Sequence, residues 1–221
     1  MKKMMQLLRE IKQNREQYTP WNSKEYTELY KRAELRISRE RAYNLLQIMQ
    51  LAIQQNGSVI EMGVYRGCTA YLICWLLQRR NIKKKVYLCD TFQGTPKMRN
   101  EEKGDVNRGG QYTDTSLEYV KNKLSAFSGN CLLIQGLIPD SLKMISQKEK
   151  YCFAHVHLNL YQSTVDALEY LRTRVCEKGI ILIEDYGVKS CVGVRSAVDE
   201  FCTQNELQFL LLGTGQLVIF V

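Results

Sequence analysis

The sequence predicts an α/β protein with a doubly wound, mostly parallel sheet of seven strands, a C-terminal antiparallel hairpin and a set of N-terminal helices. From residue 57 onward, short apolar segments alternate with longer amphipathic ones, as strands alternate with helices. Strands joined by helices pair in parallel through right-handed crossovers. The last two apolar segments have no helix between them and flank Gly213 and Gly215, which predicts the hairpin.

Three helical segments precede the sheet, at residues 4–17, 24–36 and 39–55. Their apolar residues recur every three or four positions, Pro20 separates the first two, and Ser38 is suited to cap the third. A chain of 221 residues, 45% of them hydrophobic, has enough apolar side chains for one substantial core. We therefore expect a helical segment at 1–56 and a ligand-binding domain at 57–221, together forming one globular unit.

Each strand is predicted by a short apolar run. The expected strands are residues 59–62, 86–89, 131–135, 153–158, 180–183, 207–212 and 216–221. The expected helices between them are residues 69–78, 116–127, 139–146, 164–175 and 194–203. Ligands of such sheets bind beyond the carboxyl ends of the strands, where the strand order reverses, so functional residues should follow strands directly.

Composition argues against several classes of protein. The net charge of +8 is spread through helical segments rich in acids, residues 83–85 are the only tight basic run, and we expect no nucleic-acid partner. Apolar stretches fall short of the ~20 residues that span a bilayer, so we expect no membrane partner. The eight cysteines form no Cys-x-x-Cys pair and lie mostly within predicted strands and helices, which indicates reduced thiols and a cytoplasmic protein.

The first strand leads into a turn typical of nucleotide binding. Glu61 ends the strand and is followed by Gly63 and Gly67, which allow the backbone to approach a ligand and the helix to begin close to it. The next strand ends in Asp90, about 30 residues further on, where a ribose diol needs an acceptor.

Several segments between residues 37 and 203 together resemble one family. They are 37–41 (ISRER), 61–67 (EMGVYRG), 90–96 (DTFQGTP), 160–164 (LYQST) and 184–187 (EDYG). The chain resembles the macrocin O-methyltransferase (TylF-type) family of class I, Rossmann-like S-adenosylmethionine-dependent methyltransferases, many of which act on sugars of natural products. The resemblance implies that S-adenosylmethionine binds at Glu61, Gly63, Gly67, Asp90, Thr91 and Gly136, with Asp90 on the ribose and Gly136 against the adenine.

The chain departs from this family where the catalytic acids are expected. In the family, the strand before the Tyr-x-Ser-Thr segment usually ends in Asp-x-Asp, with one acid on a divalent metal and one as general base; here these positions are His157 and Asn159. An amide cannot take a proton from an alcohol at neutral pH, so Asn159 can only orient a hydroxyl. His157 can act as a base or bind a metal, but one nitrogen cannot do both. We expect His155 to be an ordinary core residue.

The rest of the family's metal set corresponds to Glu184 and Asp185. A site of His157, Glu184 and Asp185 has mixed nitrogen and oxygen donors, so any metal bound there should be a transition metal rather than magnesium. The catalytic residues implied are His157, Asn159 and Asp185.

Three functions stay open at this point. The first is O-methylation of a small-molecule acceptor, a hydroxyl of a sugar or natural product; the second is a cofactor-binding or scaffold protein that has lost the chemistry; the third is N-methylation, because an unprotonated amine needs no strong base. Residues 95–115 are too long for an ordinary connection and are expected to form a lid that brings Arg108, Tyr112 or Asp114 near the acceptor. The resemblance also favours a homodimer.

Overall fold

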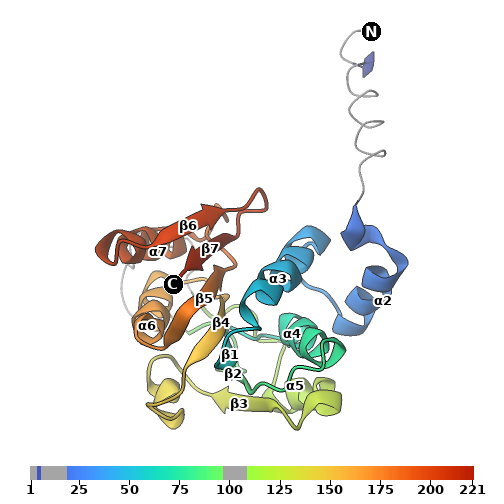
Figure 1. Ribbon diagram of the computed structural model, residues 1–221, viewed down its shortest axis with the longest axis horizontal. Helices are drawn as coiled ribbons and strands as arrows, with labels where there is room; N and C mark the ends of the chain where they lie inside the picture. Colours follow the sequence, from blue (N-terminus) through green and yellow to red (C-terminus); the bar gives the residue numbers. More distant parts are fainter. Residues whose placement is uncertain (1–3, 6–18, 97–108) are drawn as a thin grey trace.

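The computed structural model describes residues 4–5, 19–96 and 109–221, and its centre is one sheet of seven strands (Figure 1). The strand order is β3-β2-β1-β4-β5-β7-β6. Strands β1 to β5 pair in parallel, β7 runs antiparallel to β5, and β6 runs antiparallel to β7. The strands are β1 (Ser58–Met62), β2 (Val86–Asp90), β3 (Cys131–Gln135), β4 (Tyr151–Val156), β5 (Val175–Ile183), β6 (Gln208–Leu211) and β7 (Leu217–Phe220). The predicted fold class is confirmed.

Helices cover both faces of the sheet (Figure 1). One face carries α3 (Arg39–Ala52), α4 (Cys68–Arg79) and α5 (Leu117–Lys123), and the other carries α6 (Tyr161–Arg172) and α7 (Val192–Gln204). Helix α2 (Lys24–Ala33) packs on the outer side of α4. Short 3-10 helices lie at Pro20–Asn22, Ser125–Phe127 and Asp140–Met144. None of the helices in the described ranges is both long and apolar enough to cross a membrane.

The two helical layers enclose two separate apolar cores because successive strand residues point to opposite faces. Along β1, Val59 packs with α2, α3 and α4, whereas Ile60 and Met62 pack with α6 and α7. Strand β4 shows the same division, with Phe153 in the first core and Ala154 in the second. Both faces of these central strands are buried and mostly apolar, and their buried polar side chains Glu61 and His155 pair with each other.

Several element boundaries differ from the predicted ones. Helix α2 ends at Ala33, because Glu34 adopts a left-handed conformation with φ of 52°. Strand β5 begins five residues earlier than the predicted 180, since Val175 already pairs with Tyr151 before a register shift. The expected helix at 139–146 is a short 3-10 helix. The expected helix at 4–17 lies almost entirely outside the described residues.

The strand order reverses between β1 and β4, which lie side by side although β2 and β3 separate them in the chain. The residues after these two strands therefore flank the crevice where ligands of doubly wound sheets bind. Gly63 follows β1, and His157 follows β4.

Candidate functional site

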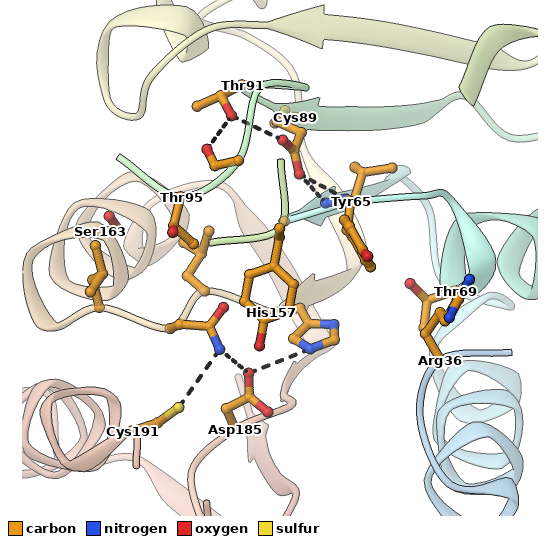
Figure 2. Close-up of a pocket in the computed structure, with 18 of the residues that line it drawn as sticks. Arg36, Tyr65, Thr69, Cys89, Thr91, Thr95, His157, Ser163, Asp185 and Cys191 are labelled. Carbon is orange, nitrogen blue, oxygen red and sulfur yellow. Dashed lines mark hydrogen bonds and ion pairs between the residues drawn. The ribbon is translucent and has the colours of Figure 1, made fainter. Parts of the chain in front are cut away.

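A cavity of about 490 Å³ lies beyond the carboxyl ends of the parallel strands (Figure 2). Its volume is in the range of pockets that bind small molecules and cofactors. Of the residues predicted for the site, those that line it are Gly63, Asp90, Thr91, Gly136, His157, Asn159 and Asp185. Three other predicted residues, Glu61, Gly67 and Glu184, lie outside this lining.

Gly63 allows β1 and β4 to approach closely at the cavity. Its φ is +90°, and a Cβ at this position would lie 2.1 Å from the carbonyl oxygen of His157. Next to Gly63, the amide of His157 donates a hydrogen bond to the carbonyl oxygen of Met62, the last residue of β1, at 2.8 Å. A side chain at position 63 would therefore both strain the backbone and push His157 away.

The other two predicted glycines have different surroundings. Gly67 has φ of +72° and is the N-cap of α4, and a Cβ there would lie 3.2 Å from Cγ1 of Val120. Gly136 has φ of +142° and lines the cavity, and a Cβ there would lie 3.0 Å from the Cβ of Ser141. Gly67 thus serves helix packing, and Gly136 leaves the cavity wall open.

Asp90 holds the glycine turn through backbone amides. The amides of Val64 and Tyr65 donate to Oδ2 at 2.6 and 2.8 Å, and the amide of Phe92 donates to Oδ1 at 2.7 Å. The Thr91 hydroxyl lies 3.3 Å from Oδ1 but only 2.6 Å from the carbonyl oxygen of Gly94, so its single proton is best donated to Gly94. A carboxylate has about four acceptor positions, which leaves one on Oδ1.

A buried ionic chain crosses the sheet beneath the cavity. His155 is fully buried, with Nδ1 2.8 Å from Glu61 Oε1 and Nε2 3.1 Å from Glu184 Oε2. Burial alone would lower the pKa of His155, but the hydrogen bonds to Glu184 and Glu61 outweigh it and raise the pKa to about 9. Burial would likewise raise the pKa of Glu184, but the hydrogen bond with His155 and nearby positive charge lower it to about 2. In this ionic chain, the protonated imidazole of His155 therefore lies between the carboxylates of Glu61 and Glu184.

Arg41 of α3 reaches over this chain to the ends of β5. Its Nε lies 2.9 Å from Glu184 Oε1, and its Nη2 lies 3.1 Å from Asp185 Oδ1. Nη2 also donates to the carbonyl oxygen of Glu184. The Arg41 side chain is 17% exposed and lines the cavity, so its charge belongs to the site.

His157 and Asp185 face each other on the cavity wall (Figure 2), and Asn159 lines the same cavity. His157 Nε2 lies 3.4 Å from Asp185 Oδ2, and the Asn159 amide donates to the same oxygen at 3.2 Å. The His157 side chain is 26% exposed and its other ring nitrogen makes no hydrogen bond with any described residue. A histidine oriented by a carboxylate, with one nitrogen available, is suited to accept a proton.

The predicted metal ligands do not form a metal site. Glu184 is fully buried on the α3 side, and its carboxylate contacts Arg41, His155 and Gln216. Within the described ranges, no group of three His, Cys, Asp or Glu side chains is arranged to hold a metal ion. Both carboxylates face the guanidinium of Arg41 instead, with Glu184 Oε1 2.9 Å from Nε and Asp185 Oδ1 3.1 Å from Nη2.

The expected lid is described only at its two ends. Tyr112 lines the cavity, and its ring meets that of Tyr65 edge-on with centroids 5.2 Å apart. Asp114 is exposed and accepts hydrogen bonds from Tyr65 and Arg66 rather than lining the cavity. Arg108 lies outside the described residues.

Two features of the site were missed in the sequence. Arg41 stands in the 37–41 segment, but nothing in the sequence indicates that it pairs with carboxylates more than 140 positions away. His155 was expected to be an ordinary core residue, whereas it bridges Glu61 and Glu184. The sequence did contain a signal for this role. Glu61, Glu184 and Asp185 lie near the carboxyl ends of neighbouring strands, and buried acids there need positively charged partners such as His155.

The sequence profile of the family described as Macrocin-O-methyltransferase (TylF) matches residues 2–215 of the chain. The chain belongs to the macrocin O-methyltransferase (TylF) family. Family membership agrees with the resemblance predicted from the sequence segments.

Individual relatives are distant. Demethyldecarbamoylnovobiocin O-methyltransferase of Streptomyces niveus is 25% identical over 73% of this chain, and 8-demethyl-8-(2,3-dimethoxy-alpha-L-rhamnosyl)-tetracenomycin-C 4'-O-methyltransferase of Streptomyces olivaceus is 24% identical over 66%. The matches span 65% and 58% of those relatives' own lengths, less than two thirds. The solved structure of the O-methyltransferase NovP shares the fold, with a TM-score of 0.74 and 21% identity, over 83% of this chain and 80% of that one.

Proposed function

We propose that this chain is an S-adenosylmethionine-dependent methyltransferase that methylates a hydroxyl of a sugar or small natural product. Its family membership supports this, as do two relatives whose names describe O-methylation of such compounds. The observation that carries the proposal is that one cavity is lined both by Gly63 and Asp90 and by the His157–Asp185 pair. The groups that bind the cofactor and the group that takes up the proton thus line the same cavity, where one methyl-accepting substrate can reach both.

The cofactor is assigned to the β1–β2 end of the cavity. There, Gly63 and Gly136 keep the walls free of side chains, and Leu137 and Leu158 offer apolar surface to an adenine ring. The remaining acceptor position on Asp90 Oδ1 is suited to one ribose hydroxyl. The carboxylate thus has two tasks, to hold the turn and to receive the cofactor.

Bound S-adenosylmethionine supplies a methyl group that is already activated on a sulfonium. The chain must hold the acceptor in line with it and remove the hydroxyl proton. His157 takes that proton at Nδ1, while Nε2 faces Asp185, which orients the ring and balances the charge that forms. Asn159 holds Asp185 by donating to it. No step requires a metal, because the predicted metal donors are already paired with protein groups.

Calorimetric titration of S-adenosylhomocysteine into chelator-treated protein tests the cofactor site. We expect micromolar binding that weakens by about tenfold or more in Asp90→Ala, a change of about 1.4 kcal/mol or more. Absence of heat with the folded wild-type protein would contradict the methyltransferase proposal and favour a scaffold role.

Transfer of a labelled methyl group to a panel of glycosylated natural products and nucleotide-linked deoxysugars tests the reaction. With an acceptor in hand, His157→Gln should lower turnover by about 100-fold or more, the usual contribution of a general base, and leave the affinity for S-adenosylhomocysteine unchanged. Equal turnover in the two proteins would remove His157 as the base.

We also propose that two copies of the chain associate. Strand β6 lies at the edge of the sheet, and large apolar side chains on it and on β7 are exposed, namely Phe209, Leu210, Leu211 and Phe220. Exposed apolar edges are common interaction sites. Sedimentation analysis of the wild type and of Leu210→Lys checks this, since the variant should be monomeric.

A further inference from the structure

Each carboxylate oxygen of Glu184 and Asp185 lies beside at least one nitrogen atom of the chain. Glu184 Oε1 faces Arg41 Nε at 2.9 Å, and Oε2 receives His155 at 3.1 Å and Gln216 at 2.8 Å. Asp185 Oδ1 faces Arg41 Nη2 at 3.1 Å, and Oδ2 receives Asn159 at 3.2 Å with His157 at 3.4 Å. Three of the four oxygens accept hydrogen bonds from the chain itself, and the fourth, Glu184 Oε1, is buried and ion-paired with Arg41 Nε without a hydrogen bond.

Among the residues that the structure describes, Arg41 alone contacts both carboxylates. A guanidinium stays protonated at any accessible pH, and its planar array of donors suits two acceptors at once. Glu184 is fully buried and Asp185 is 5% exposed, so their charges require a partner that stays in place. Helix α3 supplies it, with Arg41 near the helix N-terminus and most of its side chain covered.

From this geometry we infer that Arg41 is the resident cation of the site, occupying the charge position that the resemblance assigns to a divalent metal. The inference deepens the proposed function and rests on it for the role of His157. A metal bound through Asp185 Oδ1 would have to displace Arg41, and one bound through Oδ2 would have to displace Asn159 and His157. In either position it would lie beside the guanidinium charge. The chain should therefore bind no divalent ion there and should methylate without one.

The two departures from the family pattern fit this arrangement. Acids at 157 and 159 would add two negative charges beside Asp185, which a single guanidinium cannot balance. His157 and Asn159 instead offer nitrogen atoms to Asp185. Among the buried groups, Arg41 and protonated His155 then balance most of the charge of Glu61, Glu184 and Asp185. Arg41 is a positioning residue, because it acts on the reaction through Asp185.

Uptake of Mn²⁺ by the full-length, chelator-treated protein tests this inference, followed by the loss of the free-ion signal in electron paramagnetic resonance. We compare the wild type, Arg41→Ala, Arg41→Lys and the double variant Arg41→Ala with Asp185→Asn. We expect no stoichiometric uptake by the wild type or by Arg41→Lys at millimolar Mn²⁺. Arg41→Ala should bind one ion at least about tenfold more tightly, and the double variant should lose that gain.

Stoichiometric uptake by the wild type that Asp185→Asn abolishes would overturn the inference. So would a folded Arg41→Ala protein with no gain in affinity. Binding of S-adenosylhomocysteine reports folding of each variant, and Arg41→Gln replaces Arg41→Ala if the latter does not fold. Because cation uptake and cofactor binding are separate readouts, failure of the proposed function, seen as loss of cofactor binding by the wild type, is distinguishable from failure of this inference.

Discussion

Asp90 and Asp185 are two aspartates in matching places, each at the carboxyl end of a parallel strand and each on the wall of the same cavity. Asp90 is held mainly by backbone amides, those of Val64, Tyr65 and Phe92. Asp185 is held by side chains, those of Arg41, Asn159 and His157. The end of the cavity at Asp90 is thus held by main-chain groups, and we call it the backbone-built end. The end at Asp185 is held by side chains, and we call it the side-chain-built end.

The difference teaches where each end can change. Backbone donors are present whatever the residue type, so the Asp90 end depends on glycines and on turn conformation. Side-chain donors can be exchanged one by one, so the Asp185 end can acquire a histidine, an amide and a guanidinium without altering the fold. We expect substitutions at the first end to disturb folding and cofactor binding together, and those at the second to affect chemistry.

The largest effect should come from Gly63→Ala at the backbone-built end. The added Cβ would lie 2.1 Å from the His157 carbonyl oxygen in a left-handed conformation, so we expect a loss of about 3 kcal/mol or more in the free energy of unfolding. Urea unfolding measures it, and binding of S-adenosylhomocysteine should fall as well. Gly213→Ala is the matched control, because its Cβ would meet nothing within 4 Å. Equal stability of the two variants would contradict the packing argument.

The next largest effect should be pH-dependent and confined to the side-chain-built end. The pKa of His155 rises to about 9 in the folded protein, so its contribution is complete below about pH 6.5 and is lost as pH rises through 9. The lowered pKa of Glu184, about 2, gives stability that is present above about pH 4.5 and lost as pH falls through 2. The combined contribution of His155 and Glu184 to the free energy of unfolding is therefore greatest between about pH 4.5 and 6.5.

Thermal and urea unfolding across this range check the prediction. Stability should decline by up to about 3 kcal/mol between pH 6.5 and 9 in the wild type, and much less in His155→Gln. The difference between the two proteins isolates His155 from other titrating groups. A parallel decline in both would show that the histidine is not charged in the fold.

A smaller effect should separate the two aspartates directly. Asp90→Asn weakens charged hydrogen bonds from the turn amides and should cost about 2 kcal/mol of stability, with about tenfold weaker binding of S-adenosylhomocysteine. Asp185→Asn should leave that affinity within about twofold, because Asp185 lies at the other end of the cavity. Calorimetry on both variants makes the comparison, and the reverse order of affinities would place the cofactor at the wrong end.

The smallest effect is expected for Asn159→Asp. The new carboxylate would face Asp185 Oδ2, now 3.2 Å from the amide nitrogen, so one of the two acids should take up a proton. We expect a loss of about 1 kcal/mol in stability and no change in cofactor affinity. If an oxygen acceptor is positioned here, turnover at alkaline pH should rise relative to the wild type. Unfolding and methyl-transfer assays measure the two quantities.

Much of the fold and of the backbone-built end could be predicted because the signals are local. The alternation of apolar runs and amphipathic helices fixes the strands, and Gly63, Gly136 and Asp90 were placed by their position after strands. Val175 was placed at the end of the predicted helix 164–175 and residues 176–179 in no element, whereas the structure begins β5 at Val175 with a shift of register. Glu184 and Asp185 were grouped as metal ligands, whereas both carboxylates pair with Arg41, which precedes them by 143 and 144 positions.

By itself, the sequence determined the parallel sheet, the reversal of strand order and the set of residues at the carboxyl ends of the strands, because periodicity and turn chemistry act over a few residues. Only the tertiary structure decided which of those residues face the cavity and which are buried beneath it. Arg41 pairs with Glu184 and Asp185 because α3 packs against β4 and β5, with Arg41 close to the end of β5. Such a contact depends on the burial of charges from distant segments, and no local pattern encodes it.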